Sequence, residues 1–433
     1  MLALLVTLQL QAAGPLAAPA ADDSLPTVTL AEALRRATGL DPNYVAALGQ
    51  VDNAVWARRS AFSVFILPSV TVGAAATKYS PAFFNFATLK PEPYSVQAQL
   101  TAQYDVFTGG QKLAELTRSA AALDFANAGE VQARFSAALL TEYDYYAVLA
   151  GQELSRVARE RVQRAEQQLA VARARVSSGA AVQTDSLQLR LELSQAQVGL
   201  LHQETDLRVA RLTLGSRVGA SGPVDALPLD SLLPPELPLT LDAAVQEAAL
   251  QGPLFRQARA RERATAAVFR AQLGAYLPRA TLSWTRIGYD NRFLPSRVGI
   301  SALTLTVTFP VWDNGYRELA VSRARVNHDV ARAIREDMER SVRRDVTAAY
   351  DGFTTARAST DLAEEGLRVA RENFRVQQSR YRAGATTILD LLKAQADLDD
   401  AEAALVQARY ATRLALAGLE TILGRRLFQE RDQ

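Results

Sequence analysis

The chain has 433 residues, and 48% of them carry hydrophobic side chains, so it can bury substantial cores and its composition is not that of a disordered protein. The formal net charge is only +2, and the basic and acidic residues are interspersed, which argues against a nucleic-acid-binding surface. The chain contains no cysteine, which excludes disulfides, thiolate metal sites and a cysteine nucleophile.

The first 21 residues are expected to form a signal peptide. Met1–Leu10 is a short apolar run, and Ala18-Pro19-Ala20 has the small residues of a cleavage site. The first basic residue is Arg35, however, whereas signal peptides begin with positive charge, so a disordered apolar tail is the alternative. No later stretch approaches the roughly 18 to 20 uninterrupted apolar residues of a transmembrane helix. Any membrane crossing is therefore expected to use strands.

Residues 22–220 are expected to form a first repeat of short helices, two strands and a long helical hairpin. The strands are predicted at about 69–79 and 94–107, where apolar and polar side chains alternate. Aromatic residues are expected in the loops between paired strands, at Phe83, Phe84, Phe86 and, in the second repeat, Phe293. The hairpin is predicted at about 111–218, because no proline lies between Tyr94 and Gly222 and apolar residues recur at steps of three and four.

Residues 221–239 are rich in proline and are expected to be an extended linker to a second copy of the same unit. Residues 240–433 repeat the first half, with strands predicted at about 279–289 and 299–309 and a helical hairpin at about 316–424. Each hairpin is expected to contain one helix of about 65 residues, near 100 Å long, a turn at Gly179 or Gly384, and a returning helix of about 35.

The four predicted strands have the length and the alternation of outer-membrane strands, although a soluble half-buried sheet would alternate in the same way. Four strands cannot close a barrel, and lipid cannot satisfy a free sheet edge, so a membrane barrel requires several copies of the chain. Eight strands would leave a lumen filled by side chains, whereas twelve can leave an aqueous one. A duct therefore favours a trimer.

Several motifs occur in the same order in both halves. They are the opening Thr29-Leu30-Ala31-Glu32-Ala33-Leu34 with its copy at Thr240-Leu241, Leu-Pro before the strands at Pro68 and Pro278, the turns Val106-Phe107-Thr108-Gly109-Gly110 and Val311-Trp312-Asp313-Asn314-Gly315, and the segment from Tyr381-Arg382-Ala383-Gly384 to Ala394-Gln395. In these features the sequence from Leu30 to Gly424 resembles the outer membrane efflux protein family, of which TolC is the type member.

The resemblance implies a mainly α fold with a transmembrane β part: a homotrimer whose long hairpins form an α-barrel continuous with a twelve-stranded barrel in the cell outer membrane. It also implies a passive duct of a tripartite efflux or type I secretion system, with a periplasmic membrane-fusion adaptor and an inner-membrane pump of RND, ABC or MFS type as partners. No cofactor, metal or nucleic acid is expected. The cargo, whether drug, metal ion or polypeptide, is left open.

The resemblance also assigns site residues to the two hairpin turns. The adaptor-contact residues implied by matching position are Ser178, Gly179, Ala180, Ala181, Ala383, Gly384 and Ala385. Small residues suit intermeshing helices, although these could equally be turn residues only. The residues implied to form a periplasmic gate are Thr184, Asp185, Tyr381, Thr386, Asp390 and Lys393.

Two gate positions depart from the type member, which has an arginine where this chain has Thr386 and an acidic residue where it has Lys393. We therefore expect closure to depend more on hydrogen bonding by Tyr381 and on Arg380 or Arg382, and the constriction to be less cation-selective.

An enzyme is not expected. The two histidines, His202 and His328, lie on predicted helices without an apparent partner, and no phosphate loop, zinc spacing or nucleophile elbow is present. The alternative to a duct is a periplasmic coiled-coil scaffold or an adaptor without a transmembrane pore.

Overall fold

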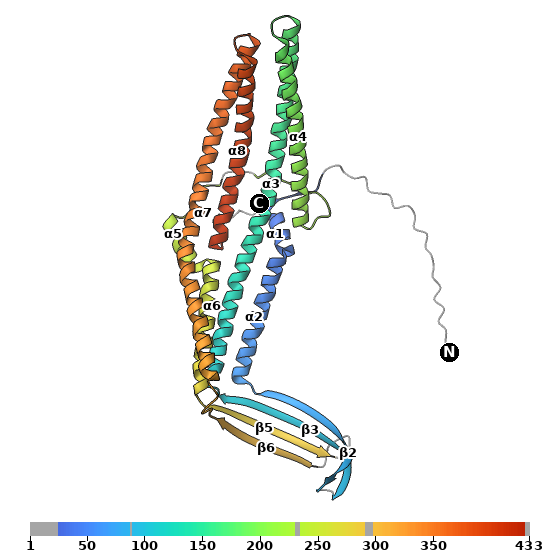
Figure 1. The fold of residues 1–433 in the computed structure, drawn as a ribbon, viewed down its shortest axis with the longest axis vertical. Helices are drawn as coiled ribbons and strands as arrows, with labels where there is room; N and C mark the ends of the chain where they lie inside the picture. Colours follow the sequence, from blue (N-terminus) through green and yellow to red (C-terminus); the bar gives the residue numbers. More distant parts are fainter. Residues whose placement is uncertain (1–24, 87–88, 230–233, 291–297, 429–433) are drawn as a thin grey trace, which may run out of the picture.

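The computed structural model describes residues 25–86, 89–229, 234–290 and 298–428. The molecule is elongated, with a sheet at one end and the turns of two long helical hairpins at the other (Figure 1). The expected signal peptide, at residues 1–21, and Phe293 lie outside the described residues.

The first half contains two short helices, two long strands and a helical hairpin. Its elements are β1 (Thr27–Val28), α1 (Leu30–Leu40), α2 (Pro42–Ile66), β2 (Ser69–Asn85), β3 (Lys90–Phe107), α3 (Gln111–Ser177) and α4 (Gln183–Arg217). The second half follows the same plan after a short strand in the linker. Its elements are β4 (Asp225–Ala226), α5 (Leu241–Gln251), α6 (Pro253–Leu273), η1 (Gly274–Tyr276), β5 (Arg279–Asp290), β6 (Val298–Thr308), α7 (Tyr316–Arg382) and α8 (Ile388–Leu423).

The four long strands form one antiparallel sheet in the order β2-β3-β5-β6. Two strands exceed the predicted ranges: β2 continues to Asn85 and β3 begins at Lys90. Phe83 and Phe84 therefore belong to β2 and not to a loop, whereas Phe86 lies just beyond the strand. The extension was hidden because a register shift between Lys78 and Phe83, in a segment that contains a proline, interrupts the alternation.

The sheet has one mainly apolar and one mainly polar face, because residues directly opposite in neighbouring strands share a face. Leu100 pairs with Val72 on β2, and Ala102 pairs with Trp284 on β5, which in turn pairs with Leu303 on β6. On the other face, Thr101 pairs with Thr71 and Thr285. The apolar face is open: Val72 is 81% exposed and Leu303 is 69% exposed.

Helix α3 is the central element of the helical part, since it packs against α2 and α6 near the sheet and against α4 and α8 toward the turns. Helix α7 packs against α6 and α8 and lies at one side of the molecule (Figure 1). The order of packed helices is therefore α2-α3-α6-α7 near the sheet and α4-α3-α8-α7 near the hairpin turns.

The linker crosses this bundle as a strap. Its strand β4 pairs in parallel with β1, which joins the two chain segments that flank the first repeat. The hydroxyl of the fully buried Tyr145 on α3 donates to the carbonyl oxygen of Leu227, at 2.6 Å, and so fixes the strap to the central helix.

The connection from β3 to α3 and the connection from α6 to β5 contact each other through glycine residues. A Cβ on Gly109, before α3, would lie 2.0 Å from the carbonyl oxygen of Gly274, and a Cβ on Gly274 would lie 1.8 Å from that of Gly109. Only glycine allows the two backbones to approach so closely. The contact sets the position of the sheet relative to both halves of the bundle.

Candidate functional site

The two hairpins end in separate turns that have the same backbone geometry. Gly179 and Gly384 adopt left-handed backbone conformations, with φ of 76° and 75°, and the amides of Ala180 and Ala385 donate back to the carbonyls of Arg175 and Arg380 at 2.8 Å each. This is the glycine-terminated end of a helix, in which the last free carbonyls are satisfied by the turn itself. Of the expected adaptor-contact residues, all are exposed except the half-buried Ala181.

The two hairpins share an apolar cluster just behind these turns. It combines Leu169, Ala172 and Leu189 of the first hairpin with Phe374, Tyr381, Ile388, Leu391, Ala394 and Leu398 of the second. Leu189 and Leu391 are fully buried, and Tyr381 is 3% exposed. The turns are consequently held at fixed positions by a common core, while their small residues remain open.

Tyr381 connects the hairpins through its phenol, which donates to an Asp185 carboxylate oxygen at 3.2 Å. Burial raises the pKa of the Tyr381 phenol, and the negative charge of Asp185 raises it further, so the phenol stays protonated as a donor. Two of the expected gate residues, from helices far apart in sequence, are thus in contact.

Arg175, which was not among the expected gate residues, binds at the same place. Its guanidinium donates to the carbonyl oxygens of Tyr381 and, at 3.2 Å, of Ala180, and its Cζ lies 4.7 Å from the centroid of the Tyr381 ring. One side chain therefore ties the turn of the first hairpin to the end of α7. Arg175 and Arg380 hold equivalent positions in the two repeats, four residues before Gly179 and Gly384, and nothing in the sequence indicates which of the two bridges the hairpins.

The other expected gate residues do not join this contact. Asp390 caps the first turn of α8, accepting from the hydroxyls of Thr387 at 2.7 Å and Thr386 at 2.9 Å. These hydrogen bonds hold the pKa of Asp390 below its usual range, and the bond from Thr387 has the largest effect. The exposed Lys393 faces Asp397, one turn along α8 at 3.3 Å, and Thr184 is exposed.

Arg380 and Arg382, which were expected to assist closure, also lie apart from Tyr381 and Asp185. Arg380 donates to the carbonyl oxygen of Ala385 in its own turn, at 3.4 Å, and Arg382 is exposed. In this structure the arginine that contacts Tyr381 is Arg175.

Further along the same seam, charged residues of α3 and α8 meet in a buried cluster. Arg164 contacts Asp399 at 2.7 Å and Glu402 at 3.0 Å, and Arg161 contacts Asp399 at 3.1 Å and Glu192 of α4 at 2.8 Å. Burial raises the pKa of Asp399, although both arginines oppose the shift. Buried ion pairs of this kind contribute more to the register of two helices than to net stability.

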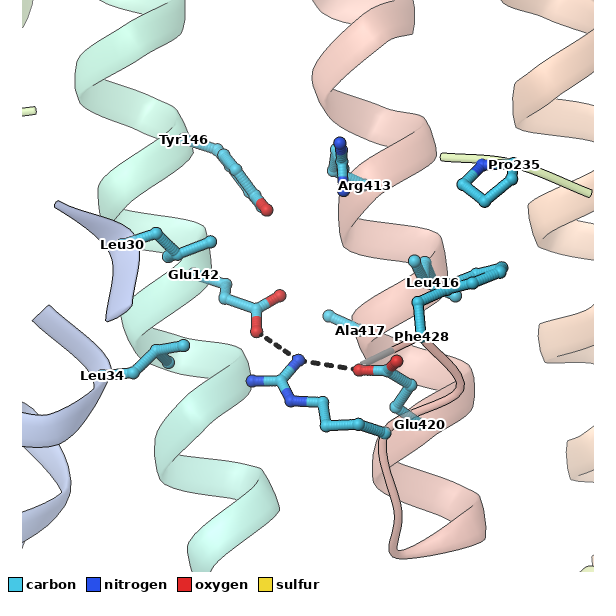
Figure 2. Close-up of a pocket in the computed structure, with 11 residues that line it drawn as sticks. Leu30, Leu34, Glu142, Tyr146, Pro235, Arg413, Leu416, Ala417, Glu420 and Phe428 are labelled. Carbon is cyan, nitrogen blue, oxygen red and sulfur yellow. Dashed lines mark hydrogen bonds and ion pairs between the residues drawn. The ribbon is translucent and has the colours of Figure 1, made fainter. Parts of the chain in front are cut away.

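A third tie lies at mid-height of the bundle, where Glu142 of α3 and Glu420 of α8 point toward each other (Figure 2). Arg426 lies between them, 2.6 Å from Glu142 and 2.7 Å from Glu420. A cavity of about 140 Å³ adjoins this pair and is lined partly by Leu30 and Phe428. Arg426 engages both carboxylates and so ties the C-terminal segment to α3 and α8.

Within the described residues, no group of three or more histidine, aspartate or glutamate side chains could hold a metal ion. No helix in that part of the chain is both long and apolar enough to cross a membrane. His202 is exposed, and His328 stacks on Phe269 with 6.3 Å between ring centroids. At the hairpin turns, the structure fixes two exposed turns on a shared apolar core.

The chain matches known proteins over most of its length. The sequence model described as outer membrane efflux protein matches residues 42–220 and 244–425. The pyoverdine export outer membrane protein OpmQ of Pseudomonas aeruginosa is 30% identical over 349 residues, which cover 76% of this chain and 70% of OpmQ.

Solved structures share the fold. The CmeC outer membrane channel of Campylobacter jejuni superposes with a TM-score of 0.79 at 15% identity, over 93% of this chain and 87% of CmeC. The outer membrane protein VceC of Vibrio cholerae gives a TM-score of 0.76 at 18% identity, over 92% of this chain and 97% of VceC.

Proposed function

Because the chain belongs to the outer membrane efflux protein family, we propose that it is one subunit of a homotrimeric duct through which substrates leave the cell passively. Members of this family are outer membrane channels and not enzymes, and the chain is a protein of the outer membrane with its helical part in the periplasm. In addition to family membership, we propose that the chain assembles as a trimer, acts passively and works with periplasmic and inner-membrane partners.

The main support for this assembly is that the sheet and the helical layer each have two free edges, and that these edges lie on the same two sides of the protomer. The sheet ends at β2 on one side and β6 on the other. The helices end at α2 and α4 on the side of β2, and at α7 on the side of β6. Head-to-tail contact between two different edges generates a ring when the rotation closes.

Both helical edges carry apolar side chains that are exposed in the described protomer. On α4 they include Leu187 and Leu201, and on α7 Leu362 and Val376. Leu201 is 65% exposed and Leu362 is 73% exposed. Leu201 and Leu362 are equally far along the chain from the turn glycines Gly179 and Gly384, so α4 of one protomer can meet α7 of the next at matched levels. Rows of exposed leucine and valine at coiled-coil spacing indicate a missing helix partner.

The sheet gives the same result at the other end of the molecule. The free backbone groups of β2 and β6 would be unsatisfied in hydrocarbon unless β6 of one copy pairs with β2 of the next. Three copies give a closed barrel of twelve strands, with the apolar face toward lipid and the Gln and Thr face toward the lumen. Trp312, at 75% exposure, and Tyr316, at 70%, mark the level of the periplasmic membrane surface.

The hairpin turns are the proposed docking surface for a periplasmic adaptor, which links the duct to an inner-membrane pump of RND, ABC or MFS type. Two features of the turns support this docking role. They are held rigidly by the apolar cluster behind them, and their exposed small residues, Gly179, Ala180, Gly384 and Ala385, let another helical hairpin approach closely.

The contact between Tyr381, Asp185 and Arg175 is the proposed closing element of the periplasmic end. It joins the two hairpins of one protomer just behind their turns, so loss of the contact would free the second hairpin to move outward. The variant Tyr381→Phe keeps the ring and removes the donated hydrogen bond, and it is expected to raise the open fraction of single channels.

Planar-bilayer recording of the purified protein tests the function. Stepwise conductance from a trimer supports the duct, and Tyr381→Phe should lengthen or enlarge its openings. A monomer that stays in water without detergent and gives no conductance would contradict the proposal and favour a periplasmic scaffold or adaptor. Strong block by trivalent cations, lost in Asp390→Asn, would show that an acidic gate persists despite Lys393.

A further inference from the structure

Basic side chains interrupt the open apolar face of the sheet, and Arg286 is one of them. Arg286 of β5 pairs with Leu100 on β3 and with Ser301 on β6, so it shares the face of Val72 and Leu303. Its side chain is exposed. An arginine on the lipid side of a barrel is strongly destabilising at the middle of the membrane and nearly neutral at the membrane surface. Its presence therefore calls for a partner or a position near the headgroups.

The Arg286 side chain extends toward the end of the sheet that is remote from the helices. In the ladder Arg286 lies opposite Ser301, yet its Nη2 lies 3.7 Å from where a Cβ of Gly299 would be. Gly299 pairs with Gly288, which is the next residue pair on the same face toward that end. The guanidinium is thus displaced outward along the strand, as long basic side chains are when they reach for the polar surface of a membrane.

The surroundings leave the guanidinium accessible. Gly288 and Gly299 present bare backbone beside it, and the small Ser301 lies opposite. In the described part of the chain, no carboxylate forms an ion pair with Arg286. A guanidinium offers five N–H donors in a planar fork that fits two oxygens of a phosphate group. The glycine pair supplies the room for such a group beside the fork.

Another basic residue on this face, Lys78, is engaged differently. Lys78 pairs with Tyr94 across β2 and β3, and its Nζ lies 5.9 Å from the centroid of the Tyr94 ring. An aromatic face thus accompanies the lysine charge within the protein. Lys78 and Arg286 provide a matched comparison: two cations on one face, of which only the arginine has an open, bidentate donor set beside a cleared surface.

We infer that Arg286, with the surface cleared by Gly288 and Gly299, binds the phosphate group of a lipid in the outer leaflet. This inference rests on the proposed function, because it requires the apolar face of the sheet to contact lipid. One site per protomer would place three lipids around the barrel, each with its acyl chains along the apolar face and its phosphate on the guanidinium. The bound lipid would offset the cost of placing Arg286 there.

Native mass spectrometry of the detergent-purified trimer, titrated with bisphosphorylated lipid A, tests the site. The wild-type trimer is expected to bind up to three lipid molecules, and Arg286→Gln to weaken binding about tenfold, because a charge-assisted bidentate contact is lost. Arg286→Lys should be intermediate, and Gly299→Leu should weaken binding by filling the cleared surface. Lys78→Gln is the matched control and should bind like the wild type.

Binding by Arg286→Gln equal to that of the wild type, or an equal loss in Lys78→Gln, would overturn the inference. Inorganic phosphate at millimolar concentration should not displace the lipid; full displacement would mean a site for free anions only. Single-channel recording separates the two proposals: Arg286→Gln should still form trimers and conduct. If the wild type forms no conducting trimer, the proposed function fails, whereas a conducting trimer that binds lipid A independently of Arg286 refutes the lipid site alone.

Discussion

Helices α3 and α7 are both 67 residues long and hold equivalent places in the two repeats, yet their surroundings differ. Helix α3 buries Tyr145, Val148 and Leu149 at the centre of the protomer, whereas α7 leaves Leu362 and Val369 exposed at its edge. The duplication therefore supplied two similar helices, and their place in the order of packing decided their role. One helix holds the protomer together, and the other is the proposed edge for contact with a neighbouring copy.

The largest difference is expected between arginines of the two helices. Arg164 of α3 is largely buried with Asp399 and Glu402, whereas Arg368 of α7 pairs with Glu365 at the surface. Arg164→Ala should cost up to about 3–5 kcal/mol of stability, since it removes the shortest ion pairs of the buried Asp399 and Glu402, which keep only Arg161 at 3.1 Å and Arg371 at 3.6 Å. Arg368→Ala should leave the stability close to that of the wild type, because an exposed ion pair contributes little. Urea unfolding of the purified protein measures both, and equal losses would contradict the contrast between the helices.

Leucines of the two helices should differ next. Leu149 on α3 is 2% exposed, and Leu149→Ala should destabilise the protomer by about 2–5 kcal/mol through lost burial and a cavity. Leu362→Ala should leave the protomer fold intact and weaken only assembly. Circular dichroism during thermal unfolding, together with the trimer fraction on native gels, separates the effects. A Leu362→Ala variant that unfolds as readily as Leu149→Ala would show that α7 is no free edge.

The two turn glycines sharpen the comparison at the hairpin ends. Both have left-handed backbone conformations, so Gly179→Ala and Gly384→Ala should each cost about 1–2 kcal/mol. The two losses should be about equal, because open space surrounds Gly179 and the Cβ added at Gly384 would lie 3.4 Å from the Arg175 guanidinium, an ordinary contact distance. Limited proteolysis at the two turns compares the variants; much faster cleavage at one turn than at the other would contradict equal strain.

The smallest expected effect is the pH dependence of the stability that Asp390 contributes to the second hairpin. Hydrogen bonds from Thr387 and Thr386 hold the pKa of Asp390 below its usual range, so the folded state favours the carboxylate. This contribution is present above the ordinary aspartate pKa of roughly 4 and is lost as the pH falls through the lowered folded-state pKa.

Asp390→Asn should therefore be less stable than the wild type near pH 7 and approach it near pH 3, as measured by thermal unfolding. A stability gap that widens on acidification would contradict the assigned sign. Helix α4 has no side-chain cap at Val182, so the first hairpin lacks the interaction made by Asp390 and serves as an internal reference for its pH dependence.

The broad fold followed from the sequence because its signals are local. The absence of proline between Tyr94 and Gly222 marked the first hairpin, and strict alternation marked the strands. The family resemblance drawn from these motifs is confirmed by the sequence match and by the shared fold of solved channels. The full length of β2 escaped because pairing resumes at Phe83 only after an irregular segment.

The packing of the two hairpins against each other was not readable from the sequence. Arg175 and Arg164 meet partners more than two hundred residues away, and such distant contacts leave no local pattern. The same holds for Arg426, whose link to Glu142 fixes the C-terminal segment to α3. Asp390 was assigned to the gate by matching position, while its capping bonds depend on a turn geometry that only the structure displays.

Disulfide or maleimide cross-linking of a Leu201→Cys, Leu362→Cys double variant tests the central claim most directly, because the chain has no other cysteine. Contact between α4 of one copy and α7 of the next should produce a covalent trimer on denaturing gels, while either single variant should remain a monomer. A covalent dimer as the final product, or the absence of any cross-link in membrane-inserted protein, would contradict a closed ring of three copies.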